Sequence, residues 1–148
     1  MELVLDTFVL KVGQNADDER SLDVLALLHG INSSHTIAVD YGHLILGEYF
    51  RNIPSDCHAG KWLGVVSSRS DKLVFRDGRV TNVHRDILLN QLHFDRSDLV
   101  FVGVAARTPD RILVSEESDY SENIKEYLLD EIGVRVVSIH EALQLIQG

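Results

Sequence analysis

Acidic side chains recur at points in the sequence where a folded chain could bring them together. Asp6 directly follows the apolar run 3–5, and the acidic cluster 116–119 follows a second apolar run. Glu48 interrupts the apolar stripe of a predicted helix, and Asp98 opens the most apolar segment of the chain. A charge directed toward the interior is costly unless it is paired or binds a cation. Hard divalent cations prefer oxygen ligands, so convergence of these acids would point to Mg²⁺ or Mn²⁺.

Each acid also has a purely structural explanation when it is taken alone. Asp6 and Glu117 could cap helices or lie in solvated turns, and Asp98 could simply cap the helix that it opens. Glu48 could form an ion pair with Arg51 or face solvent. If the acids do meet, their mutual repulsion would raise their pKa values until a cation neutralised them. Such a cation can activate a bound water against a phosphodiester, which makes nucleic acid hydrolysis a chemical possibility.

The apolar pattern predicts strands alternating with helices along the chain. Strands are expected at 3–5, 36–39, 111–114 and 134–139, and helices at 17–29, 41–52, 86–93, 97–106, 121–132 and 141–146. The segment 97–106 fits a buried strand or a buried helix, and the helix is favoured because the next strand needs a crossover before it. Residues 55–83 are expected to be irregular. This order predicts an α/β fold with a mostly parallel sheet covered by helices on both faces.

Composition narrows the classes of protein that are possible. The chain has 148 residues, of which 45% are hydrophobic and 25% charged, as expected for a single folded domain with a buried core. Its single cysteine excludes an internal disulfide, and its histidines lack the spacing of a zinc site. No apolar run approaches ~20 residues and no basic leader is evident, so we expect a cytoplasmic protein without a membrane span.

Charge is distributed unevenly along the chain. The net charge is −9, yet segment 51–111 holds ten of the fourteen basic residues and only seven acids. This asymmetry suits a protein with one basic surface and an acidic pocket. Basic side chains of the segment are candidates for contacts with a nucleic acid backbone: Arg69, Arg76, Arg79 and Arg107.

These residues together resemble the PIN domain of metal-dependent ribonucleases. The resemblance rests on Leu3-Val4-Leu5-Asp6-Thr7, Glu48-Tyr49 in a helix after the second strand, Asp98 opening an apolar segment, and the run 113–120. It spans almost the whole chain and keeps the order of the elements. It implies a single PIN-like domain over residues 1–148 with a three-layer α/β/α sandwich, often a homodimer, that cuts RNA with Mg²⁺ or Mn²⁺. In the toxin branch of that family, a small antitoxin protein covers the site.

The resemblance also implies roles for individual residues. Asp6, Glu48, Asp98 and Glu117 would occupy the catalytic, metal-binding quartet, with Asp119 as a further metal ligand and Thr7 in support. Two positions depart from the family pattern: Phe8 stands where many members have Asn, and Glu117 stands where Asp is usual. These departures favour an alternative, a PIN-like binding or scaffold module that acts with a protein partner.

Overall fold

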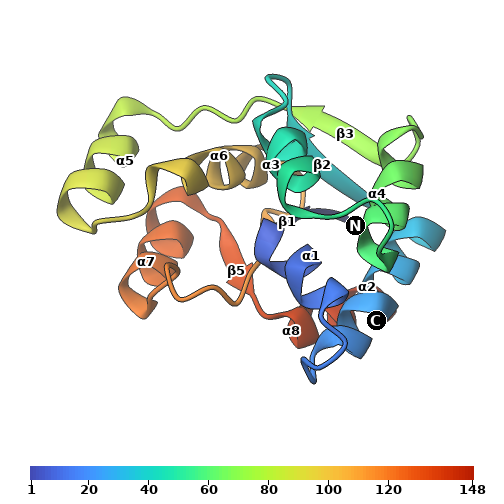
Figure 1. The fold of residues 1–148 in the computed structure, drawn as a ribbon. Helices are drawn as coiled ribbons and strands as arrows, with labels where there is room; N and C mark the ends of the chain where they lie inside the picture. Colours follow the sequence, from blue (N-terminus) through green and yellow to red (C-terminus); the bar gives the residue numbers. More distant parts are fainter.

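A central parallel sheet organises the chain, and the computed structural model describes it over residues 1–148 (Figure 1). Its strand order is β3-β2-β1-β4-β5, and every neighbouring pair is parallel. The strands are β1 (Glu2–Leu5), β2 (Thr36–Asp40), β3 (Leu73–Arg76), β4 (Ile112–Val114) and β5 (Arg135–Val137). Strand β1 is buried along its whole length, which explains its apolar residues Leu3–Leu5, and its one charged residue, Glu2, is bonded to Arg76 of β3.

Helices cover both faces of this sheet, so the predicted three-layer α/β/α sandwich is confirmed. On one face α1 (Thr7–Gln14), α2 (Ser21–Ser34), α4 (His58–Ser67) and α8 (Ile139–Gln147) pack together. On the other face α6 (Leu99–Arg107) contacts β1, β2 and β4. The remaining helices are α3 (Leu44–Asn52), α5 (Asn82–Asp86) and α7 (Glu122–Tyr127). One hydrophobic core of 40 buried residues joins the layers.

The prediction of an irregular segment over residues 55–83 was wrong, because the structure contains α4 and β3 there. Gly60 and Gly64 lower the helix propensity of α4, so the sequence pattern did not predict a helix there. Burial of Trp62 and Leu63 against the core outweighs that propensity. Strand β3 lies at the edge of the sheet and is only half-buried beyond Leu73, so it lacks a continuous apolar signal.

Helix α1 was not predicted either. Its apolar residues follow the apolar residues of β1 after only two intervening positions, so the sequence gives no visible boundary between strand and helix. The other helices occur where they were expected, with shifted ends. Helix α2 runs through Gly30, whose missing Cβ leaves room for Ile146 of α8. Helix α3 starts only at Leu44, because His43 adopts a left-handed backbone conformation (φ 62°) before it.

The remaining predicted segments also need small corrections. The expected helix 86–93 begins earlier, as α5, and continues as a π-helical turn over Ile87–Gln91. Segment 97–106 is helical, as predicted, with a 3₁₀ turn over Arg96–Asp98 leading into α6. Helix α7 also continues as a π-helical turn and ends at Gly133 (φ 82°), the predicted stop.

The two glycines of α4 allow a direct test of this packing. An added Cβ at Gly60 would overlap the carbonyl of Pro54, whereas at Gly64 it would meet nothing within 4 Å. We expect Gly60→Ala to lower the free energy of unfolding by about 2 kcal/mol or more through overpacking. Gly64→Ala should instead raise it by about 0.5–1 kcal/mol through helix propensity. Urea denaturation of both variants checks this, and equal effects would contradict the assigned packing.

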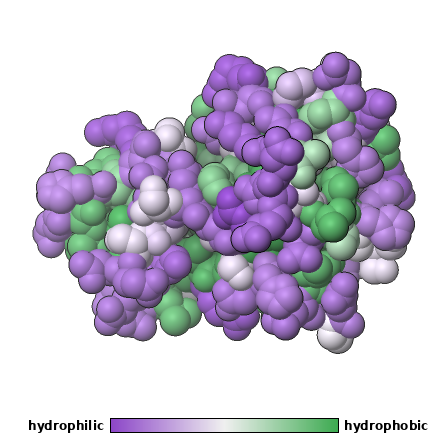
Figure 2. All heavy atoms as spheres, turned by 60° about the horizontal axis from the view of Figure 1, so that its bottom comes forward, coloured by the Kyte–Doolittle hydropathy of each residue, from purple (hydrophilic) through white to green (hydrophobic).

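Exposed hydrophobic side chains are spread over the surface. Figure 2 shows them in several places, among them the left-hand end, where α5 and α7 lie in Figure 1. Val83 of α5 and Leu129, just after α7, are exposed. None of the helices combines the length and the apolar character needed to cross a membrane.

Candidate metal centre

Strand register places the first two site residues side by side. Leu5 of β1 pairs with Val114 of β4, so Asp6 and Ser115 follow at the same carboxyl edge of the sheet. The Ser115 hydroxyl donates a hydrogen bond to Oδ2 of Asp6 (2.7 Å) and accepts one from the backbone N–H of Glu117 (3.1 Å). Ser115 therefore positions both acidic residues.

Asp98 lies at the same carboxyl edge of the sheet, just before the start of α6. Helix α6 is part of the connection between parallel strands, so its amino end lies at the carboxyl edge, and the 3₁₀ turn with Asp98 lies there too. One carboxylate oxygen from each of Asp6, Asp98 and Glu117 lies within 4.8 Å of the other two. Asp6 and Asp98 are buried, and none of the three forms an ion pair with Lys or Arg.

Burial and mutual repulsion make this trio electrostatically unfavourable. Burial, followed by the charges of Asp6 and Glu117, raises the pKa of Asp98 to about 8. Burial and the charge of Asp6 raise the pKa of Glu117 to about 7. Burial also raises the pKa of Asp6, although the hydrogen bond from Ser115 opposes this shift. A divalent cation would remove the repulsion and keep all three groups ionised.

Glu48 lines the same cleft but lies outside the trio. Its carboxylate accepts a hydrogen bond from the Thr7 hydroxyl, and it forms no ion pair with Arg51. The buried hydroxyl of Tyr49, the next residue of α3, donates to the carbonyl of Leu5. These two contacts fix α3 to the end of β1, beside Asp6.

The fifth predicted ligand belongs to a second acidic group. Oxygens of Asp119, Asp98 and Asp95 lie within 4.8 Å of one another, so Asp98 connects the two groups. Asp95 is exposed and accepts hydrogen bonds from the backbone N–H and hydroxyl of Ser97. The structure thus brings all five predicted carboxylates to one cleft. Four of them belong to the two overlapping groups, and Glu48 lies outside both.

The cleft has the size of an ion site rather than of an organic cofactor site. Its volume is about 130 Å³, whereas small-molecule sites usually have about 300–1,000 Å³. Its lining is almost wholly polar. It consists of Asp6, Thr7, Phe8, Lys11, Glu48, Asn52, Asp95, Ser97, Asp98, Glu117 and Asp119.

Tyr120 gives an independent sign of a ligand next to the trio. It is 3% exposed, packs edge-on against Phe94, and its hydroxyl is buried without a hydrogen-bond partner. Burial and the charges of Asp6 and Asp98 raise its pKa well above the ordinary value of 10. A buried hydroxyl of this kind is normally satisfied, so its position fits a site whose bound ion and waters complete the hydrogen bonding.

Ser115, Asp95 and Lys11 are among the residues in or beside this cleft that sequence reasoning did not assign to the site. Ser115 follows β4 just as Asp6 follows β1, and this equivalence of strand ends could have identified it. Asp95 stands three residues before Asp98, a spacing that places two side chains on one side of a helical turn. Lys11 of α1 gave no signal, because an exposed lysine in a helix is ordinary.

Phe8 also lies in the cleft lining. It is half-buried, and the guanidinium of Arg20 lies 5.2 Å from its ring centroid. Position 8 therefore offers an apolar surface to the cleft.

The four arginines predicted to contact RNA bond to other groups of the protein, and none of them lines the cleft. Arg69 precedes β3, at the amino edge of the sheet, and pairs with Asp71. The other three bind neighbouring groups: Arg76 pairs with Glu2, Arg79 pairs with Asp77, and Arg107 donates to the carbonyls of Asp77, Arg79 and Gly103.

The donor set fits Mg²⁺ or Mn²⁺. Two oxygens on one Mg²⁺ at ~2.1 Å are at most about 4.2 Å apart, close to the 4.8 Å within which the oxygens of Asp6, Asp98 and Glu117 lie. Small side-chain rotations would close that difference.

Comparison of the chain with protein-family models, curated proteins and solved structures found no match.

Proposed function

We propose that this protein is a metal-dependent endoribonuclease of the PIN type, in which Asp6, Asp98 and Glu117 would hold Mg²⁺ or Mn²⁺. The observation that carries this proposal is the closeness of three carboxylates, two of them buried, without a paired cationic side chain. The unpartnered hydroxyl of Tyr120 beside them supports it. Their order along the chain is also that of the acidic residues in the PIN family.

The chain's own residues have separable roles in such a hydrolysis. The bound ion would supply positive charge to the phosphate and lower the pKa of a bound water. The water oxygen bonds to phosphorus, one P–O ester bond breaks, and a proton passes to the departing oxygen. Ser115 orients Asp6, and Thr7 orients Glu48. Glu48 lies outside the trio and would orient the water or accept its proton.

A cleavage assay on labelled RNA tests the proposal. Wild-type protein should cut the RNA with Mn²⁺ or Mg²⁺ and lose all activity in EDTA. Asp6→Asn should lose at least about 10³-fold of the rate, as expected when a group that holds the charge-stabilising centre is removed. Asp130→Asn is the matched control, because Asp130 is exposed and makes no side-chain contact with the site. Full activity of Asp6→Asn would contradict the assignment.

The second candidate is a PIN-like binding or scaffold module that acts with a protein partner. Phe8 favours it, because an aromatic ring in the cleft lining can neither bind a metal nor orient a water. A module of this kind would have no catalytic metal, so its carboxylates would remain without a bound cation.

Thermal denaturation with and without Mn²⁺ separates the two candidates. Mn²⁺ at 100 times its dissociation constant would add about 2.7 kcal/mol to stability. For a chain of this size, that raises the melting temperature by about 5–10 °C. Ca²⁺ and EDTA samples control for ionic strength and for contaminating metal. An unchanged melting temperature at millimolar Mn²⁺ would argue against the metal centre.

A further inference from the structure

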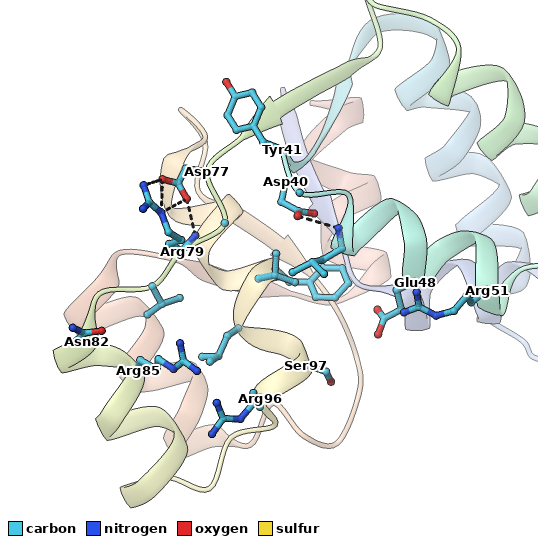
Figure 3. A pocket seen from close by; sticks show the side chains of 17 residues that line it. Asp40, Tyr41, Glu48, Arg51, Asp77, Arg79, Asn82, Arg85, Arg96 and Ser97 are labelled. Carbon is cyan, nitrogen blue, oxygen red and sulfur yellow. Dashed lines mark hydrogen bonds and ion pairs between the residues drawn. The ribbon is translucent and has the colours of Figure 1, made fainter.

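A larger groove opens beside the carboxylate cleft and shares two residues with it. Its volume is about 840 Å³, and it lies between α3 on one side and α5 with the 3₁₀ turn on the other. Glu48 and Ser97 line both the groove and the cleft. A ligand lying in the groove would therefore reach the edge of the carboxylate cleft at Glu48, which Figure 3 shows at one end of the groove.

Unpaired arginines gather in this groove. Of the ten arginines in the chain, six make side-chain hydrogen bonds or ion pairs: Arg20, Arg69, Arg76, Arg79, Arg107 and Arg111. Three of the other four line the groove, namely Arg51, Arg85 and Arg96. In Figure 3, Arg85 and Arg96 lie near each other, whereas Arg51 lies beside Glu48 on α3. Guanidinium groups without an internal partner are suited to bind phosphate.

The acids of the groove are already engaged by the fold. Asp40 accepts hydrogen bonds from the backbone N–H groups of Leu44 and Ile45, at the start of α3. Asp77 pairs with Arg79, and Glu48 accepts from Thr7. The positive charge of the free arginines is therefore not cancelled by direct pairing, in a chain whose net charge is −9.

The groove also offers surfaces for unpaired bases. Its floor includes apolar side chains from the start of α6, among them half-buried Val100. Tyr41 lines its rim with 68% of its surface exposed, and its ring stacks on Phe75 with centroids 6.1 Å apart. Aromatic rings beside a basic groove are typical of sites for single-stranded nucleic acid, because unpaired bases stack on them.

We propose that this groove binds the single-stranded RNA segment next to the bond that is cut. Arg51, Arg85 and Arg96 contact phosphates, and Tyr41 provides a stacking surface. The proposal deepens the nuclease function and rests on it for the choice of RNA. It also moves the RNA contacts away from Arg69, Arg76 and Arg107, whose side chains serve internal bonds.

Fluorescence anisotropy with a labelled oligouridylate tests the groove. Binding is measured in EDTA, where no cleavage can take place, at several salt concentrations. The test variant is Arg85→Gln/Arg96→Gln, and the matched control is Arg69→Gln/Arg135→Gln, which removes the same charge at the amino edge of the sheet. The test variant should bind at least about tenfold more weakly. The slope of log affinity against log salt should fall by roughly 0.7 for each phosphate that the variant no longer neutralises.

Tyr41→Ala probes stacking separately from charge. It should weaken binding about tenfold and leave the salt slope unchanged, as expected when a base no longer has a ring to stack on. Unaltered binding by the double arginine variant, or an equally large effect in the control, would overturn the proposal. So would equal affinity for duplex RNA, or tighter arginine-dependent binding of polyglutamate, which would indicate an acidic protein partner. Arginine-dependent binding without cleavage in Mn²⁺ would instead contradict only the nuclease.

Discussion

Asp98→Asn is expected to abolish metal-dependent RNA cleavage and, in EDTA, to raise the melting temperature. The two effects have one cause, because the carboxylate that would bind the ion is buried beside Asp6 and Glu117. Burial and repulsion raise the pKa of Asp98 to about 8, so ionising it in the metal-free protein costs stability. An asparagine keeps the shape and removes the charge. We expect cleavage to fall at least about 10³-fold, and the melting temperature at pH 8 to rise by about 5 °C or more.

Ser138 provides the control for stability, because it lies outside both acidic groups. Its hydroxyl caps α8 by accepting a hydrogen bond from the backbone N–H of Glu141 (3.0 Å). Ser138→Ala removes this cap and should lower the free energy of unfolding by about 1 kcal/mol. Differential scanning calorimetry in EDTA should therefore show a higher melting temperature for Asp98→Asn and a lower one for Ser138→Ala. A lower melting temperature for Asp98→Asn would show that its carboxylate is needed as a cap, and would contradict a repulsive cluster.

Stability of the metal-free protein is expected to fall as the pH rises from about 5.5 to 8.5. The pKa values of Asp98 and Glu117 are raised in the folded state to about 8 and about 7. Between their unfolded and folded pKa values, the folded state binds more protons than the unfolded state. The free energy of unfolding therefore decreases as the pH rises. The stability that proton binding to Asp98 and Glu117 contributes is lost as the pH passes through 7 and 8.

Saturating Mn²⁺ should flatten this dependence, because the ion replaces the protons. Urea denaturation across the pH range, in EDTA and in Mn²⁺, measures both curves. The double variant Asp98→Asn/Glu117→Gln is the control, since it lacks these two carboxylates and retains every other titratable group. An unchanged slope in the double variant would refute the origin of the pH dependence in the carboxylates.

Alternation of strands and helices could be predicted from the sequence because each element has its own apolar period. The exceptions have physical reasons. In α4, Gly60 lies against the Pro54 carbonyl. This close approach exists only in the folded chain, so helix propensity does not predict it. Helix α1 shares an apolar run with β1, and only burial in the folded chain distinguishes the two.

Convergence of the carboxylates could be anticipated for the residues that follow strands. Asp6 lies at a strand end, where parallel sheets place their ligands. Asp95 and Ser115 were missed because their roles depend on partners across the fold, Asp98 in one case and Asp6 in the other. The RNA contacts were the least predictable part of the site. Arg76 is engaged by Glu2 of another strand, and the linear order of charges does not reveal such a pairing.

The bond from the Tyr49 phenol to the Leu5 carbonyl has a mechanical consequence. It joins the helix that bears Glu48 to the last residue of the strand that precedes Asp6. On the opposite bank of the groove, α5 is joined instead to α7, by a hydrogen bond between the His84 ring and the Tyr127 hydroxyl (2.7 Å). The spacing between Asp6 and Glu48 is therefore fixed independently of that bank.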